Sequence, residues 1–137
     1  MKQLKINHLA ILACVVVGQI VPILWYTSFS TPWMAGHHIT MEQGQNSPPT
    51  PYIIAIVYSI VSAYTMAYLF KRMNVNSVAD GFKTASLIGI AFTLMYSMTN
   101  ILFTFKPFYL TWIDGGVFVI VYAIFGVIIG GWRKYEG

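Results

Sequence analysis

The chain has 137 residues, of which 57% are hydrophobic and only 9% are charged, and its mean hydropathy is +0.66. Soluble domains carry about 25% charged residues, so this composition excludes an ordinary soluble fold and indicates that much of the surface faces lipid. Nine Tyr, nine Phe and four Trp exclude an intrinsically disordered chain. The formal charge of +4 does not indicate nucleic-acid binding, because the basic residues stand at the ends of apolar runs.

Four apolar runs predict membrane spans at about residues 9–26, 52–70, 84–105 and 112–132. A helix rises about 1.5 Å per residue and the hydrocarbon core is roughly 30 Å thick, so each run can cross it with help from interfacial residues at its ends. The runs are too long for barrel strands and lack polar alternation. We therefore predict an all-α membrane protein, with residues 1–137 forming a single domain of four antiparallel transmembrane helices and a long loop over residues 27–51.

The basic residues indicate the orientation of these spans. One side of the membrane receives seven of them: Lys2, Lys5, Lys71, Arg72, Lys83, Arg133 and Lys134. The other side receives only Lys106, and the loop 27–51 has no Lys or Arg. The positive-inside rule then predicts that both termini are cytoplasmic and that the loop 27–51 lies outside. A cleavable signal peptide is the alternative for the first run, but that run ends in Trp25-Tyr26 instead of small residues, so we expect a retained helix.

Small residues recur at every fourth position of the spans and predict close helix packing. The packing positions that we single out are Gly18, Ala63, Gly89, Gly126 and Gly130. Helices in lipid associate through van der Waals fit and hydrogen bonds, which small faces allow. Two interpretations remain open: packing within one four-helix bundle, or homodimerisation through the GxxxG spacing of Gly126 and Gly130.

Aromatic residues near the ends of the spans predict interfacial anchors. They are Trp25, Tyr26, Trp33 and Trp112 at the outer interface and Trp132 at the inner one. Next to Trp112, the spacing of Thr111 and Asp114 predicts a capping box at the start of the fourth helix.

No catalytic signature is present, so an enzyme is the weaker class and we expect no cofactor. What remains is a set of polar residues at membrane depth, which are candidates for a binding cluster: Gln19, Tyr58, Ser59, Asn100, Asp114 and Tyr122. Polar residues inside membranes tend to face the bundle interior. The set predicts either a hydrogen-bonded structural core or an outward-opening pocket in which Asp114 is the only acid.

The outer loop contains His37 and His38, the weak candidates for a metal site, close to two methionines. Imidazole and thioether groups are copper or zinc ligands. Adjacent histidines point in different directions on a helix or strand, and no second acid or thiol lies nearby in the sequence, so we predict no metal site.

Several short motifs resemble a known family. They are Ile6-Asn7-His8-Leu9-Ala10, Trp25-Tyr26, Trp33-Met34, Phe105-Lys106-Pro107, Ile113-Asp114-Gly115, and finally Gly126, Gly130 and Trp132. Across nearly the whole chain these residues resemble the bacterial family of small multi-pass membrane proteins known as domain of unknown function 1761. The resemblance implies a location in the bacterial cytoplasmic membrane and supplies no reaction.

Two functions follow from these observations as hypotheses. The first is a non-catalytic accessory or packing subunit of a larger membrane assembly, with the lipid bilayer and other membrane subunits, or further copies of the chain, as its partners. The second is a small oligomeric transporter or solute-binding protein that uses the outward polar cluster.

Overall fold

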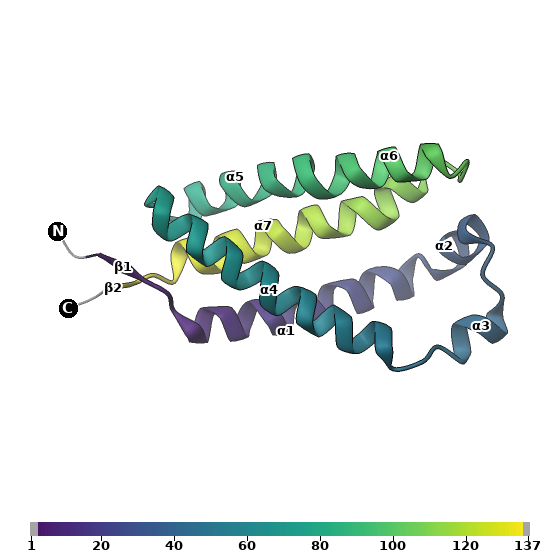
Figure 1. Cartoon of the computed structure of the whole chain (residues 1–137), viewed down its shortest axis with the longest axis horizontal. Helices are drawn as coiled ribbons and strands as arrows, with labels where there is room; N and C mark the ends of the chain where they lie inside the picture. The colour runs from purple at the N-terminus through teal and green to yellow at the C-terminus, as the bar shows by residue number, and fades with distance from the viewer. Residues whose placement is uncertain (1–2, 136–137) are drawn as a thin grey trace.

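A computed structural model describes residues 3–135 and contains four helices that are long and apolar enough to cross a membrane (Figure 1). This confirms the predicted all-α fold with four membrane spans. The first span is α1 (His8–Ser28) and the second is α4 (Thr50–Met73). The third, Val78–Phe103, consists of α5 (Val78–Ile88), the π-helical segment η1 (Gly89–Leu94) and α6 (Met95–Phe103). The fourth, Thr111–Gly131, consists of the π-helical segment η2 (Thr111–Gly115) and α7 (Gly116–Gly131).

The third helix begins at Val78, six residues before the predicted start at residue 84. Ser77 caps it, because the Ser77 hydroxyl accepts a hydrogen bond from the Asp80 amide at 3.1 Å. Asp80 lies in the first turn, where a carboxylate is favoured by the helix dipole. The sequence prediction excluded this turn from the span because it contains charges.

Two short helices occupy the segment that was predicted as the loop 27–51. α2 (Ser30–His37) follows α1 directly, and α3 (Met41–Gln45) begins with a capping box between Thr40 and Gln43. Between them, His38 adopts the left-handed backbone conformation with φ of 54°, which ends α2. We call the end of the bundle that carries α2, α3 and the 104–110 turn the loop end.

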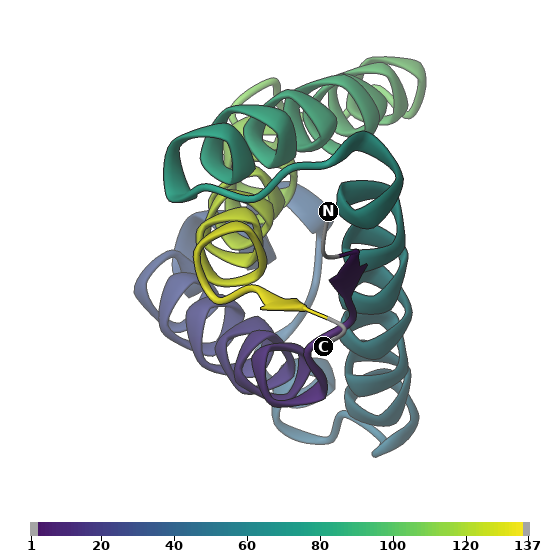
Figure 2. The ribbon, with the colours of Figure 1, turned by 90° about the vertical axis from the view of Figure 1, so that its left-hand side faces the viewer.

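The two termini meet at the opposite end, which we call the terminal end. β1 (Leu4–Lys5) and β2 (Lys134–Tyr135) form an antiparallel ribbon in which Lys5 faces Lys134. Figure 2 shows this ribbon among the ends of α1, α4 and α7. Asn7 caps α1 with its side-chain oxygen, and its Nδ2 donates to the Trp132 carbonyl at 3.2 Å. One side chain thus joins the start of the first span to the end of the fourth.

α7 is the central helix, because it packs against α1, α4 and α5. Its residues Val117 and Phe125 are fully buried, together with Cys14 of α1 and Ala63 and Phe70 of α4. In the most apolar stretch of the fourth span, 50% is buried inside the bundle. In the corresponding stretch of the third span, only 11% is buried. The third helix therefore lies at the edge of the bundle, with most of its surface outward.

The small residues of α7 pack inside the chain. Gly126 and Gly130 face Gly81 of α5, and a methyl group added at Gly81 would overlap the Gly126 carbonyl oxygen. Elsewhere Gly18 lies against Ser59 and Phe125, Gly89 lies against Val119, and Ala63 is fully buried. These contacts agree with the first of the two packing interpretations, in which the small residues pack within one four-helix bundle. Gly81 was not among the predicted packing positions, because it lies in the turn that the prediction placed outside the span.

Candidate functional site

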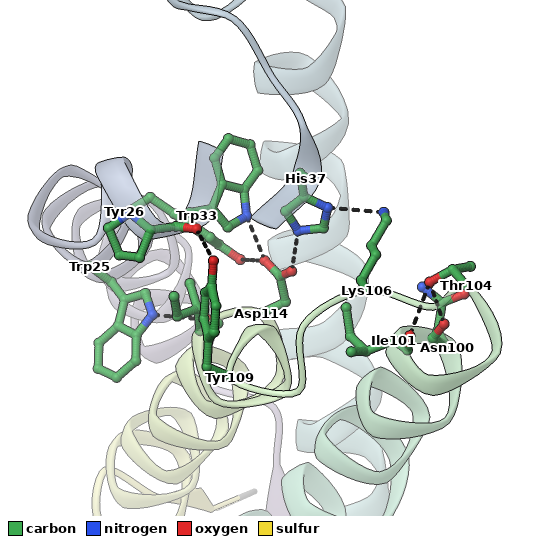
Figure 3. Close-up of polar contacts among 12 residues, drawn as sticks. Trp25, Tyr26, Trp33, His37, Asn100, Ile101, Thr104, Lys106, Tyr109 and Asp114 are labelled. Atoms are coloured by element: carbon green, nitrogen blue, oxygen red, sulfur yellow. Dashed lines mark hydrogen bonds and ion pairs between the residues drawn. The ribbon is translucent and has the colours of Figure 1, made fainter. Parts of the chain in front are cut away.

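Asp114 of η2 accepts hydrogen bonds from three side chains at the loop end (Figure 3). Its Oδ1 accepts from the Tyr26 hydroxyl at 3.0 Å and from the Trp33 indole Nε1 at 2.8 Å. Its Oδ2 lies 2.7 Å from His37 Nε2. The three donors come from the last turns of α1 and from α2, so the carboxylate joins the predicted outer loop to the fourth span.

Lys106 extends this network through His37. Its Nζ lies 3.0 Å from His37 Nδ1. A lysine ammonium has only donors, so Nδ1 accepts the bond and the imidazole carries its proton on Nε2, from which it donates to Asp114. The result is a chain from the Lys106 cation through a neutral imidazole to the Asp114 carboxylate. We call Tyr26, Trp33, His37, Lys106 and Asp114 the loop-end network.

The folding of α2 places these side chains. Trp33 and His37 are four residues apart and therefore lie on one face of the helix. Gly36 is buried, and a methyl group there would lie 2.8 Å from both Leu110 Cδ1 and the Tyr109 hydroxyl, so α2 rests closely on the start of the fourth helix.

Two more bonds cross the same contact. Trp25 Nε1 donates to the Ile113 carbonyl at 2.9 Å, and the Tyr109 hydroxyl donates to the Pro32 carbonyl at 2.8 Å. Together with the loop-end network, these bonds hold the end of α1 and the whole of α2 against η2 and the turn before it. Four aromatic side chains take part: Trp25 and Tyr26 of α1, Trp33 of α2, and Tyr109.

The partial burial of His37 and Asp114 strengthens the electrostatic interaction between them. The side chains of His37 and Asp114 retain only 17% and 24% of their exposure, so water screens their attraction less than at an open surface. A carboxylate that accepts several charge-assisted bonds is held firmly in place. Within residues 3–135 no three His, Cys, Asp or Glu side chains come together as metal ligands, and His38 is exposed.

The predicted capping box of Thr111 and Asp114 is wrong. The amides of Leu110 and Thr111 already donate to the carbonyls of Pro107 and Phe108, so the helical turn begins before Thr111. The Thr111 hydroxyl is buried and has no hydrogen-bond partner among residues 3–135, and the Asp114 carboxylate bonds to side chains of α1 and α2 instead.

The other predicted polar residues form two further groups deeper in the bundle. Gln19 Nε2 donates to Ser59 Oγ at 2.9 Å and to the Ala55 carbonyl at 3.4 Å. The hydroxyls of Tyr58 and Tyr122 lie 2.5 Å apart, and Ser62 lies 3.4 Å from Tyr122.

The last predicted residue, Asn100, is exposed on α6, and within the described residues its side chain makes no hydrogen bond. The structure thus separates the six candidates into the loop-end network, two paired groups and one outward residue.

A cleft lies between α4, α5 and α7. The ribbon in Figure 1 shows that α4 diverges from the third helix toward the loop end. The cleft encloses about 160 Å³, and its lining is apolar apart from three hydroxyl side chains, Ser62, Thr65 and Tyr122. We call it the lateral cleft.

The sequence predicts that Tyr26 and Trp33 are interfacial anchors and assigns no role to Lys106. The available signals are the four-residue spacing of Trp33 and His37 and the position of Lys106 as the one basic residue on the predicted outer side. Trp112 and Trp132, in contrast, are exposed, as an interfacial anchor requires.

Comparison with known proteins identifies a family but no individual relative. The family model that matches is described as "Protein of unknown function (DUF1761)" and covers residues 9–130. No curated protein and no solved structure matches the chain.

Proposed function

The chain belongs to the DUF1761 family, whose function is unknown, and from its geometry we propose that it is a membrane-embedded accessory subunit that docks against another membrane protein. The single observation that carries this proposal is the position of the third helix. It packs on only one side, and the lateral cleft opens beside it. The proposed partner is a transmembrane helix of another protein that fills this side of the bundle.

The polar side chains support a structural role. Gln19 bonds to Ser59, and Tyr58 bonds to Tyr122, so these groups satisfy one another across helices. Asp114, the acid that a solute pocket would use, accepts three bonds from its own chain. A polar group inside a membrane that is already paired has little capacity left for a ligand.

The outward surface of the third helix supports a docking role. Leu87, Phe92, Tyr96 and Phe103 are each between 67% and 79% exposed. Large aromatic side chains are enriched at protein contacts.

A small oligomeric transporter or solute-binding protein is the second candidate. The hydroxyls of Ser62, Thr65 and Tyr122 favour it, because they place polar atoms in an otherwise apolar cleft at membrane depth. Several copies would be needed to enclose a pathway, since the cleft is open to the side.

The proposed location is the bacterial cytoplasmic membrane, with the terminal end in the cytoplasm and the loop end outside. Support comes from the basic residues: those within residues 3–135 gather at the terminal end, except Lys106. Basic residues accumulate on the cytoplasmic side of multi-pass proteins.

Purification from native membranes tests the proposed function. The chain is tagged after Gly137, extracted in a mild detergent and analysed for bound proteins. We expect one or more other membrane proteins in stoichiometric amounts, and we expect Phe92→Ala to weaken their retention while Leu12→Ala on α1 does not. A homo-oligomer that contains only this chain and a bound small molecule would contradict the accessory role and support the second candidate.

A further inference from the structure

Two neighbouring polar side chains of α6 face outward without a hydrogen-bond partner. Tyr96 is 70% exposed, and Asn100, four residues further along the helix, is exposed as well. Residues four positions apart are neighbours on the surface of a helix, so the phenol and the amide lie side by side. Among residues 3–135 neither side chain makes a hydrogen bond. We call Tyr96 and Asn100 the α6 polar pair.

The threonines of the same segment are paired, in contrast. Thr99 Oγ1 donates to the Met95 carbonyl at 2.9 Å, and Thr104 Oγ1 donates to the Asn100 carbonyl at 2.7 Å. A threonine hydroxyl can reach the backbone of its own helix one turn back. The hydroxyl of Tyr96 stands at the far end of a rigid ring and has no such partner, so it depends on a group from outside the helix.

The α6 polar pair lies at a depth where lipid surrounds the helix. At about 1.5 Å per residue, Tyr96 is roughly 10 Å from the end of α6 at Phe103. Phe103 and Phe105 are more exposed than Tyr96 and lie closer to the loop end than Asn100, so the apolar surface continues past the pair. The Cα–Cβ bonds of a helix tilt toward its N-terminus, which in the third helix is the terminal end, and so both side chains start in the direction away from the nearer interface. Unpaired polar groups in hydrocarbon are costly, which favours a hydrogen-bonding neighbour.

The shape of this face indicates which neighbour fits. Phe92 and Phe103 flank the pair and are strongly exposed. Helices in lipid approach closely where small residues let the backbones come together. A second copy of the same face would set large side chains against large ones, and Gly126 and Gly130 of this chain already pack on α5. A helix of another protein, with small residues around one polar side chain, is therefore the better complement.

We propose that the α6 polar pair is a hydrogen-bonding site for a transmembrane helix of the partner protein, and that this helix carries Asn or Gln at the level of Asn100. An amide both donates and accepts, so it can pair with the Asn100 amide in both directions and use its second N–H for the Tyr96 hydroxyl. A charged side chain would cost more at this depth. This inference rests on the proposed accessory role and names the chemistry by which the partner is recognised.

Retention of the partner during purification from native membranes tests the proposal. The tagged full-length chain is extracted in a mild detergent, and the partner bound per chain is quantified by mass spectrometry. Asn100→Leu and Tyr96→Phe each remove a hydrogen-bonding group and keep most of the side-chain volume. We expect Asn100→Leu to weaken retention roughly threefold to twentyfold and Tyr96→Phe about threefold, as the loss of hydrogen bonds between membrane helices would.

Thr99→Val is the matched control, because Thr99 is exposed next to Asn100 and its hydroxyl already bonds to the Met95 carbonyl. It should retain the partner. Alkylation of Cys14, which is fully buried, shows whether each variant is folded. If Asn100→Leu exposes Cys14, Tyr96→Phe decides the matter. Equal losses in Thr99→Val and Asn100→Leu, or full retention in folded Asn100→Leu, would overturn the proposal.

Mapping the contact tests the chemistry of the partner. A photoreactive amino acid at position 99 is crosslinked in cells, and the crosslinked partner peptide is sequenced. We expect Asn or Gln within four residues of the crosslinked position. Replacement of that residue by Leu should weaken retention of the wild-type chain and have little further effect on Asn100→Leu. A partner helix without an amide side chain at this level would overturn the proposal.

The variants also separate this proposal from the accessory role. If Phe92→Ala loses the partner and Asn100→Leu keeps it, the accessory role stands and the hydrogen-bonding site is wrong. If the wild-type chain retains no other membrane protein, or only a second copy of itself, both are wrong.

Discussion

His37 Nε2 lies 2.7 Å from Asp114 Oδ2, although 77 positions of the chain separate the two residues. This contact joins α2 to η2 and thereby fixes the segment that follows the first span on top of the fourth. Lys106, in the turn before the fourth helix, bonds to the other nitrogen of the same imidazole. One histidine therefore connects three segments of the loop end.

The neighbouring histidines allow a matched test of this contact. His37→Asn removes the bonds to Asp114 and Lys106 and is expected to lower the free energy of unfolding by about 1–2 kcal/mol. His38→Asn is the control, because His38 is exposed and asparagine tolerates its left-handed backbone. Its effect should stay within about 0.5 kcal/mol. Thermal unfolding followed by Cys14 alkylation measures both, and equal effects would show that the contact does not stabilise the fold.

The crossing of α5 and α7 predicts strong sensitivity at Gly81. A methyl group there would overlap the Gly126 backbone, so Gly81→Ala should destabilise the chain by about 1–3 kcal/mol in spite of the better helix propensity of alanine. Gly116→Ala is the control, since the nearest atom to its added methyl group would be a Trp25 ring carbon at 3.9 Å. It should leave stability unchanged or raise it slightly. A tolerated Gly81→Ala would contradict the close crossing.

In the predicted polar cluster, Gln19 has hydrogen-bond partners and Asn100 has none among the described residues. This difference should appear in the free energy of unfolding of variants at the two positions. Gln19→Leu removes the bonds to Ser59 and Ala55 and should cost about 0.6 kcal/mol, with roughly 1.7 kcal/mol as the upper end for such bonds in membranes. Asn100→Leu should change stability by less than about 0.5 kcal/mol, because Asn100 faces outward. The reverse order of the two effects would show that Asn100, and not Gln19, belongs to the core.

Phe105 is strained, and its replacement should stabilise the chain. Its φ is 56° and its side chain is 96% exposed, so a bulky residue adopts a left-handed backbone without compensating burial. Phe105→Asn should raise the free energy of unfolding by about 1 kcal/mol. Phe103→Asn, which removes a similarly exposed phenyl ring at the end of α6, should give no such gain. Similar effects in the two variants would assign the change to hydrophobicity instead of backbone strain.

The sequence predicts the spans well and the contacts between them poorly. Long apolar runs locate all four helices, since length and hydropathy are local properties. The start of the third helix is missed because Asp80 and Lys83 are charged, and charged residues next to an apolar run are taken as part of a loop. Both lie in the first turns of the helix. The role of Asp114 is missed for a different reason: its partners Tyr26, Trp33 and His37 lie 77 to 88 positions away, and the four-residue spacing of Trp33 and His37 does not show which residue they contact.

The aromatic residues at the ends of the spans also show that the sequence does not predict contacts between helices. Trp25, Tyr26, Trp33, Trp112 and Trp132 all look like interfacial anchors in the sequence. The first three turn inward to hydrogen-bond with the fourth helix, while the last two remain exposed. Which of them turns inward depends on how the end of α1 and α2 pack against the fourth helix, and only the tertiary structure shows that.

Photocrosslinking in living cells tests the accessory role most directly. A photoreactive amino acid is placed at Phe92 of the third helix, which is 73% exposed, and in a separate variant at Leu12 of α1, which is 59% exposed. We predict that Phe92 forms a discrete adduct with one other membrane protein and that Leu12 does not. Adducts with lipid alone at both positions, or an adduct at Phe92 only with a second copy of this chain, would contradict it.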